Sequence, residues 1–167
     1  MSVALRLAGA DERVVVERLA QLEAHDLSEL TGELPDDSGR YAVPRLDRFF
    51  TETDHRARLI EDEGVPIGFC LVRPVEGAAF VHSFFVLRAV RRHGVGAQAA
   101  RALVATHDGP WAIAFLERYD AAARFWRGVA ARAVGDDWSE ERRTQDDEVF
   151  GWITFDTSPR AAGSGGA

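Results

Sequence analysis

The sequence contains no lysine and no asparagine, so all 20 of its basic residues are arginines. Any role that a lysine ammonium or an asparagine amide fills in other proteins must therefore fall to a different side chain here. The single cysteine, Cys70, stands in an apolar run, which excludes a disulfide framework within the chain and argues against a thiolate metal site. We accordingly expect no metal and a reducing compartment.

Long hydrophobic runs are absent as well. No stretch approaches the roughly 20 apolar residues that a membrane-spanning helix needs, and Arg6, Asp11 and Glu12 stand where a signal peptide would have its apolar segment. The formal net charge of -7 does not suit a surface that binds phosphate backbones. We therefore expect a cytoplasmic protein with no membrane and no nucleic-acid partner.

The length and composition fit one domain. A chain of 167 residues with a hydrophobic fraction of 46% buries a core without help from disulfides or metals. No internal repeat or interdomain linker is visible, and the last ten residues are rich in Gly, Ala and Ser. We predict a single domain over residues 1–157 and a disordered C-terminal tail over residues 158–167.

Hydrophobic spacing and turn residues predict an α/β succession of elements. The expected helices are Asp11–Leu27, Pro44–Phe50, Gly96–Thr106 and Asp120–Ala131. The expected strands are Val3–Leu7, a strand from Arg56 to the turn at Asp62-Glu63-Gly64, Val65–Val72, Ala78–Leu87, Trp111–Leu116, Arg132–Trp138 and Glu148–Asp156. The three strands that begin at Arg56, Val65 and Ala78 are joined by tight turns, so we expect them to be antiparallel.

The turn between the strand Ala78–Leu87 and the helix Gly96–Thr106 carries the chemistry. It consists of Arg91, Arg92, His93, Gly94, Val95, Gly96 and Ala97. Glycines let backbone N–H groups face a ligand closely, and the helix N-terminus adds unpaired donors and the positive end of its dipole. The segment therefore predicts a site for a pyrophosphate.

Two runs resemble motifs of the GNAT superfamily of N-acetyltransferases. Residues 84–96 (FFVLRAVRRHGVG) resemble motif A, in which a strand with an apolar-x-Val pattern precedes Arg/Gln-x-x-Gly-x-Gly/Ala. Residues 116–129 (LERYDAAARFWRGV) are similar to motif B, in which Asn-x-x-Ala leads into an aromatic pair. Their order and spacing agree with the family over roughly residues 3 to 157. The resemblance is greatest to a branch of uncharacterised predicted acetyltransferases with Phe-Trp-Arg in the last helix.

The resemblance implies a GNAT fold, an α/β (α+β) arrangement with a mixed, mainly antiparallel sheet of six or seven strands flanked by helices. It further implies that acetyl-CoA is the cosubstrate and lies in a wedge between two splayed strands. Backbone groups of Phe84, Phe85 and Val86 would bind the pantetheine arm, the turn would hold the pyrophosphate, and Trp126 would belong to the same cofactor site. The acetyl group would pass to the primary amine of a small molecule.

The catalytic positions depart from the family pattern. Tyr119 stands where motif B usually has Asn, and Trp126 stands where a Tyr often protonates the departing thiolate, although an indole N–H is a poor acid. Tyr119 is therefore our candidate acid. Many relatives carry a glutamate near the position of Ser83, where this sequence has the polar pair His82-Ser83, so His82 is one candidate base. Glu117 is the other, because it stands at the C-terminal end of the strand Trp111–Leu116, where open α/β sheets place ligands.

Two alternatives stay open in the sequence. Residues 94–99 also match the Rossmann pattern Gly-x-Gly-x-x-Ala, but Arg88–His93 separate them from the preceding strand, and hairpins rather than helices join the strands before it. A catalytically inactive acyl-CoA-binding or interaction module is the other alternative. The acceptor is undecided among amino acid, antibiotic, polyamine and protein N-terminus, and edge strands near the C-terminus allow a homodimer.

Overall fold

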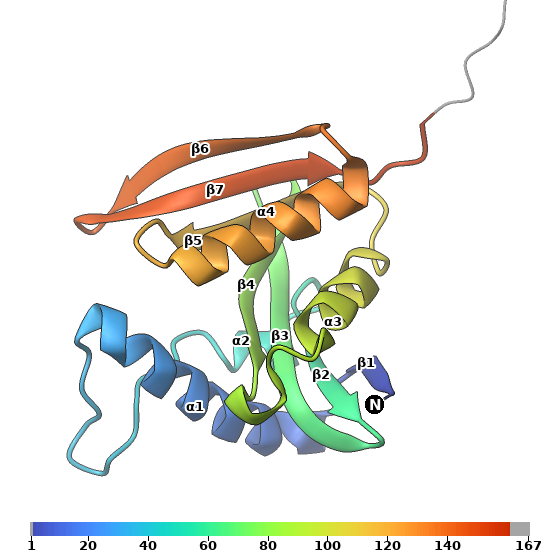
Figure 1. Ribbon diagram of the computed structural model, residues 1–167. Coiled ribbons are helices and arrows are strands. Elements are labelled where there is room, and N and C mark those ends of the chain that lie inside the picture. The colour runs from blue at the N-terminus through green and yellow to red at the C-terminus, as the bar shows by residue number, and fades with distance from the viewer. Residues whose placement is uncertain (1, 161–167) are drawn as a thin grey trace, which may run out of the picture.

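A computed structural model describes residues 2–160 of the chain (Figure 1). Its strands are β1 (Val3–Leu7), β2 (Arg56–Asp62), β3 (Val65–Val75), β4 (Ala78–Val86), β5 (Pro110–Leu116), β6 (Trp138–Gln145) and β7 (Glu148–Asp156). Its α-helices are α1 (Arg13–Thr31), α2 (Arg48–Thr51), α3 (Val95–Val104) and α4 (Asp120–Val134), and short 3-10 helices span Ala10–Glu12 and Arg88–Val90. Most of the predicted tail, residues 161–167, lies outside the described part.

The seven strands form one mixed sheet in the order β1-β2-β3-β4-β5-β7-β6. All neighbouring strands are antiparallel except β4 and β5, which are parallel. This arrangement confirms the expected sheet of six or seven mainly antiparallel strands. The strands β1 and β6 are the two edges, and the homodimer suggested by a C-terminal edge strand stays a prediction.

The strands β4 and β5 separate soon after they meet. Their pairing runs only from Ala79 opposite Trp111 to Val81 opposite Ile113, whereas β4 continues to Val86 and β5 to Leu116. Beyond Val81 the edge of β4 that faces β5 therefore has no strand beside it. The expected wedge between these two strands is present.

A β-bulge interrupts β4 at the start of this wedge. Leu71 of β3 pairs with Ser83 and Val72 pairs with Val81, so His82 is the extra residue. Such a bulge twists the strand and changes the direction of the side chains around it. It thereby places His82 and Ser83 where the two strands begin to separate.

Helices cover both faces of the sheet (Figure 1). Alternate residues of β4 point to opposite faces: Phe85 belongs to the core cluster under α1 and α2, while Phe84 packs on the cluster under α3 and α4. The helix α1 contributes Val16, Leu19 and Ala20 to the first cluster. None of the helices among residues 2–160 combines the length and apolarity that crossing a membrane requires.

The predicted strand Arg132–Trp138 is wrong. The helix α4 continues to Val134 and ends at Gly135, whose φ of 68° is readily adopted only by glycine, and the strand β6 begins at Trp138. Since β6 is an edge strand and most of its side chains are exposed, it lacks the apolar alternation that identifies a strand from sequence. The remaining elements agree with their predicted positions within a few residues, although α1 extends four residues further and α2 is shorter.

Candidate active site

A cavity of about 480 Å³ opens between α1, the second half of β4, the turn before α3 and the start of α4. Its lining comes from all four regions: Glu23, Asp26, Leu27, Phe84, Phe85, Val86, Arg91, Arg92, Gly94, Gly96, Ala97, Tyr119, Ala121, Ala122, Phe125 and Trp126. Most of the residues that the sequence assigned to cofactor binding between Phe84 and Ala97 are among them, as is Trp126. The structure therefore brings the two sequence motifs together around one cavity.

The strand β4 and two aromatic residues of α4 form the apolar side of this cavity. The Phe84 ring lies 5.6 Å from the Phe125 ring and 5.2 Å from the Trp126 ring, measured between ring centroids. These contacts hold α4 against β4 at the point where β5 has moved away. The cavity thus combines an apolar wall with backbone N–H and C=O groups of Phe84–Val86 that no neighbouring strand occupies on that side.

The turn before α3 has the backbone that a small anion site needs. Arg92 and Gly94 both adopt the left-handed region, with φ values of 69° and 76°. Gly94 is the N-cap of α3, and its carbonyl accepts a hydrogen bond of 3.0 Å from the N–H of Gln98. The first turn of α3 leaves its own N–H groups without helical partners, so they and the helix dipole favour a negative ligand here.

The arginines of this turn differ in their partners. Asp26 of α1 accepts hydrogen bonds from Arg88 at 2.8 Å and from Arg91 at 2.6 Å. Arg91 also donates to the carbonyl of Val86 at 2.8 Å, which draws its side chain toward β4. Among the ion pairs within residues 2–160, Arg92 takes no part. Arg92 is consequently the cation of the turn that is best placed to meet a ligand directly.

Two members of the predicted cofactor site lie beside the cavity rather than in its lining. His93 is exposed, and Val95 is fully buried in a small cluster with Ile60, Ile67 and Val86. The side chain of Val95 therefore anchors the turn to the core. Because neither side chain lines the cavity, we expect His93 and Val95 to contribute to cofactor binding through their backbone groups only.

Glu23 is a residue of the cavity that the sequence reasoning missed. It is half-buried on α1, and burial raises the pKa of its carboxyl group to about 7. The nearby charge of Asp26 raises this pKa further, while an interaction with the Ser83 side chain lowers it. Glu23 therefore exchanges a proton near neutral pH inside the cavity.

A signal for Glu23 was present in the sequence. On α1 it follows the buried Val16 and Ala20 by seven and three residues, so it falls on the apolar stripe of the helix. A carboxylate at such a position is costly unless it has a function or a partner. The apolar spacing of Val15, Leu19 and Leu22 predicts the helix but not its buried face, because Leu22 is exposed and the buried residues are Val16, Leu19 and Ala20.

The two bases proposed from sequence occupy different surroundings. Glu117 is exposed just after β5 and outside the cavity lining, and its carboxylate pairs with Arg142 at 2.6 Å. His82 is half-buried in the bulge of β4, and its Nδ1 faces Arg73 Nε at 3.4 Å. Burial, together with the charges of Arg73, Arg45 and His55, lowers the pKa of His82 to about 4. The imidazole of His82 is therefore neutral at physiological pH.

Tyr119, the candidate acid, lines the cavity from the N-cap position of α4. The same cavity is lined by the α1 residues Glu23 and Asp26, which come from an element far earlier in the chain. The structure thus brings one acidic side chain of raised pKa and one phenol to the same cavity.

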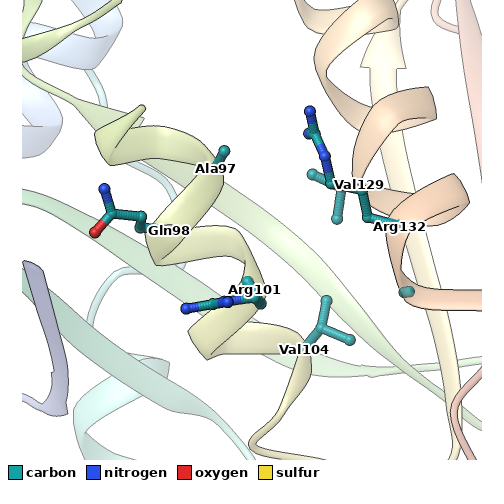
Figure 2. A pocket seen from close by; sticks show the side chains of 7 residues that line it. Ala97, Gln98, Arg101, Val104, Val129 and Arg132 are labelled. Atoms are coloured by element: carbon teal, nitrogen blue, oxygen red, sulfur yellow. The ribbon is translucent and has the colours of Figure 1, made fainter. Parts of the chain in front are cut away.

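A second groove runs between α3 and α4 (Figure 2). It has a volume of about 280 Å³ and is lined by Ala97, Gln98, Arg101, Val104, Val129, Arg132 and Ala133. Ala97 lines both the cavity and this interhelix groove, so the two are neighbours at the first turn of α3. Arg101 and Arg132 make the groove electropositive.

Residues 19–131 match the model of the acetyltransferase (GNAT) family, and the chain belongs to that family. It is a GNAT-family acetyltransferase, and the family uses acyl-CoA. A search among curated proteins found no match for the chain.

Solved structures of the same fold are distant in sequence. An acetyltransferase from Thermus thermophilus is 15% identical with a TM-score of 0.69, and the match covers 93% of this chain and 97% of that one. The ribosomal-protein-S18-alanine N-acetyltransferase from Escherichia coli is 10% identical with a TM-score of 0.68, covering 97% and 98% of the two chains. PaiA N-acetyltransferase from Thermoplasma acidophilum, solved in complex with coenzyme A, is 10% identical with a TM-score of 0.63, covering 93% and 99%. At these identities the likeness establishes the fold.

Proposed function

We propose that the protein is an acetyl-CoA-dependent N-acetyltransferase that acts on the primary amine of a small molecule. The observation that carries this proposal is the cavity that joins the unpaired edge of β4 to the glycine turn at the N-terminus of α3. When bound, acetyl-CoA supplies the activated acetyl thioester. The chain supplies the groups that hold this cosubstrate and move the proton.

The residues present fit acetyl-CoA. The backbone of Phe84–Val86 can bond the amides of a pantetheine arm as a neighbouring strand would, because β5 leaves that edge vacant. Any other residue at Gly94 would have to adopt a left-handed backbone, and a side chain at Gly96 larger than a methyl group would press on the Phe125 ring, which lies 3.4 Å from the position of a Cβ. Glycine at both positions therefore preserves the shape of the turn. Arg92 and the interhelix groove with Arg101 and Arg132 offer positive charge to the nucleotide end.

Glu23 accepts the proton of the attacking amine in this proposal. A general base works best when its pKa lies near the working pH, and the carboxyl group of Glu23 meets that requirement within the cavity. Tyr119, on the same cavity, donates a proton to the departing thiolate. The predictions for His82 and Glu117 as bases have less support, because the first is a weak base in this environment and the second is engaged by Arg142.

The test is a screen of primary amines with acetyl-CoA, in which thiol release is followed with and without each acceptor. We expect at least one acceptor to raise thiol release well above the acceptor-free background and to yield its N-acetyl derivative by mass spectrometry. Tight binding of acetyl-CoA with no acetylated product from any amine would contradict the proposal and favour the inactive acyl-CoA-binding module instead.

A further inference from the structure

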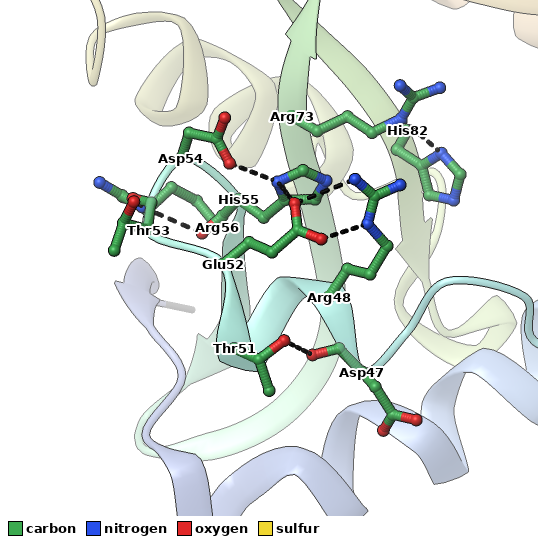
Figure 3. A network of polar contacts seen from close by, with 10 residues as sticks. All are labelled: Asp47, Arg48, Thr51, Glu52, Thr53, Asp54, His55, Arg56, Arg73 and His82. Atoms are coloured by element: carbon green, nitrogen blue, oxygen red, sulfur yellow. Dashed lines mark hydrogen bonds and ion pairs between the residues drawn. The ribbon is translucent and has the colours of Figure 1, made fainter.

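Three arginines gather beside the bulge of β4, and two of them have no acidic partner among the described residues. Arg48 of α2 pairs with Glu52, which it reaches through Nη2 at 3.0 Å. Arg45 and Arg73 take part in no ion pair within the part of the chain that the structure describes. Figure 3 shows Arg48 turned toward Glu52 while Arg73 reaches toward His82. Although the protein is acidic overall, Arg45 and Arg73 thus leave unneutralised positive charge beside the bulge of β4.

The positive charges of this cluster lie close enough to lower the pKa values of Arg73 and His82. Burial lowers the pKa of the Arg73 guanidinium, and the charges of Arg45 and Arg48 lower it further. Arg73 and Arg45 also contribute to the low pKa of His82. The carboxylates of the polar network in Figure 3 that lie near this cluster are Glu52, held by Arg48, and Asp54, which accepts a hydrogen bond of 2.7 Å from His55. A negative ligand would relieve the repulsion among these arginines.

The cluster lies along β4 just beyond the end of the cavity, and none of its residues is part of the cavity lining. The cavity follows β4 from the anion-binding turn past Val86 and Phe84, and Ser83, the next residue back along the strand, interacts with Glu23. His82 follows at the bulge, where β4 and β5 close together. Arg73 pairs with Phe80 across β3 and β4, two residues further on. A molecule whose amine lies at Glu23 can therefore reach His82 and Arg73 if it continues along β4.

The donors of this cluster suit a carboxylate. With Nδ1 of neutral His82 accepting from Arg73 Nε, the imidazole carries its proton on Nε2 and can donate it. The Arg73 guanidinium keeps its Nη groups for a ligand, and a planar guanidinium binds a carboxylate through two parallel hydrogen bonds. Arg45 adds a second charge from the loop before α2, where its backbone has a φ of 67°.

We propose that Arg73, with Arg45 and His82, binds a carboxylate of the acceptor, so that the substrate is a small amine that also carries a carboxylate group. This inference rests on the proposed function, since it concerns the acceptor of the same reaction. It selects amino acids among the acceptor classes that the sequence left open, and it disfavours polyamines, which would be repelled by the arginines.

The experiment compares acceptors that differ only by the carboxylate: γ-aminobutyrate with propylamine, and phenylalanine with phenethylamine. We expect at least one carboxylated member to have a kcat/KM about 10-fold or more above that of its counterpart. In Arg73→Gln the KM for that acceptor should rise about 10- to 100-fold with kcat within a few-fold, as expected for the loss of a charge-assisted pair. The KM for the decarboxylated amine should stay unchanged, and Arg73→Lys should recover part of the loss.

Two controls keep the outcome interpretable. Arg18→Gln removes an exposed arginine of α1 and should change neither constant. If Arg73→Gln does not fold, Arg45→Gln can replace it as the test variant, because Arg45 is an exposed loop residue. Calorimetric titration with the N-acetylated product measures carboxylate binding without turnover. Equal kcat/KM values within both pairs, or equal effects of Arg73→Gln on both members, would overturn the inference while leaving the N-acetyltransferase intact. Absence of product from every amine would overturn both proposals.

Discussion

Asp26 on α1 accepts a hydrogen bond of 2.6 Å from the guanidinium of Arg91, which stands 65 residues later in the turn before α3. The same carboxylate accepts one of 2.8 Å from Arg88. Asp26 therefore neutralises two of the arginines in and beside the turn that we propose as the phosphate site. A pyrophosphate bound at this turn would have to compete with the Asp26 carboxylate for Arg91.

Asp26→Asn should raise the affinity for coenzyme A by about threefold to tenfold at low salt, because it removes a negative charge next to a polyanion site. The gain should shrink as ionic strength rises. Calorimetry at two salt concentrations measures both effects, with Asp37→Asn in the exposed loop as the matched control. A weaker affinity in Asp26→Asn would mean that Arg91 needs Asp26 to hold it in place.

Gly94→Val should weaken acetyl-CoA binding by about 10-fold or more, since a β-branched residue at a φ of 76° forces the turn to change. Gly96→Val should have a similar effect because a Cβ there already lies 3.4 Å from the Phe125 ring, so the two methyl groups of valine have no room beside it. Circular dichroism should show an intact fold in both variants. Gly128→Ala within α4, where a Cβ would make an ordinary contact, is the control and should leave binding unchanged. Normal acetyl-CoA binding in both valine variants would show that the turn is not the phosphate site.

Glu23→Gln should lower kcat by about 100-fold and abolish the rise of the rate through pH 7, as expected when a general base is removed. The free amine of the acceptor also titrates, so the profile should be recorded with two acceptors of different amine pKa; the limb that belongs to Glu23 does not move between them. Glu117→Gln is the matched control at an exposed site. Should Glu117→Gln show the loss and Glu23→Gln not, the base is Glu117, one of the two candidates from the sequence.

The raised pKa of Glu23 should make the free energy of unfolding decrease as the pH rises toward neutral. The folded protein raises the pKa of this carboxyl group from 4.5 to about 7 and so holds its proton more firmly than the unfolded chain does. The stabilisation from the protonated group is complete below about pH 4.5 and is lost as the pH rises through 7. Glu23→Gln should therefore lose less stability than the wild type between about pH 5 and pH 8, as measured by urea unfolding. Identical slopes in the two proteins would contradict the raised pKa.

Tyr119→Phe should lower kcat while acetyl-CoA affinity stays close to that of the wild type, because the ring remains and only the phenol proton is lost. Single-turnover kinetics separate the chemical step from product release. Unchanged single-turnover rates would show that the thiolate leaves without an acid.

The parts of the molecule that the sequence could predict are those set by local patterns. The hairpins β2-β3-β4 and the glycine turn before α3 depend on neighbouring residues, and they were placed within a few positions. The strand β6 was missed because its mostly exposed polar residues need only β7 beside them to form a strand. The predicted end of α4 at Ala131 is too early, because the residues between Ala131 and Gly135, where the helix stops, are compatible with either a helix or a strand.

The sequence pointed to residues of the proposed cofactor side of the cavity and not to those of the proposed acceptor side, for a physical reason. Gly94 and Gly96 act through their own backbone, so their pattern is readable in one segment. Glu23 and Arg73 acquire their properties from packing: α1 has to be placed over β4 before Glu23 is buried, and α2 has to bring its arginine to β3 before the charge of Arg73 is crowded. The burial of Glu23 and the crowding of Arg73 result from contacts between distant segments, so they cannot be predicted from any single stretch of sequence.

The pairing between β4 and β5 is the weakest junction of the sheet because it is so short. Only the residue pairs that join Ala79–Val81 to Trp111–Ile113 connect the four N-terminal strands to the three C-terminal ones. Two halves that are joined by so short a ladder should move relative to each other more easily than the halves of a continuous sheet. A pantetheine arm bound as we propose, along β4 and beside α4, would link them. We therefore expect coenzyme A to slow amide hydrogen exchange on both sides of the β4–β5 junction, in β5 as well as in β4.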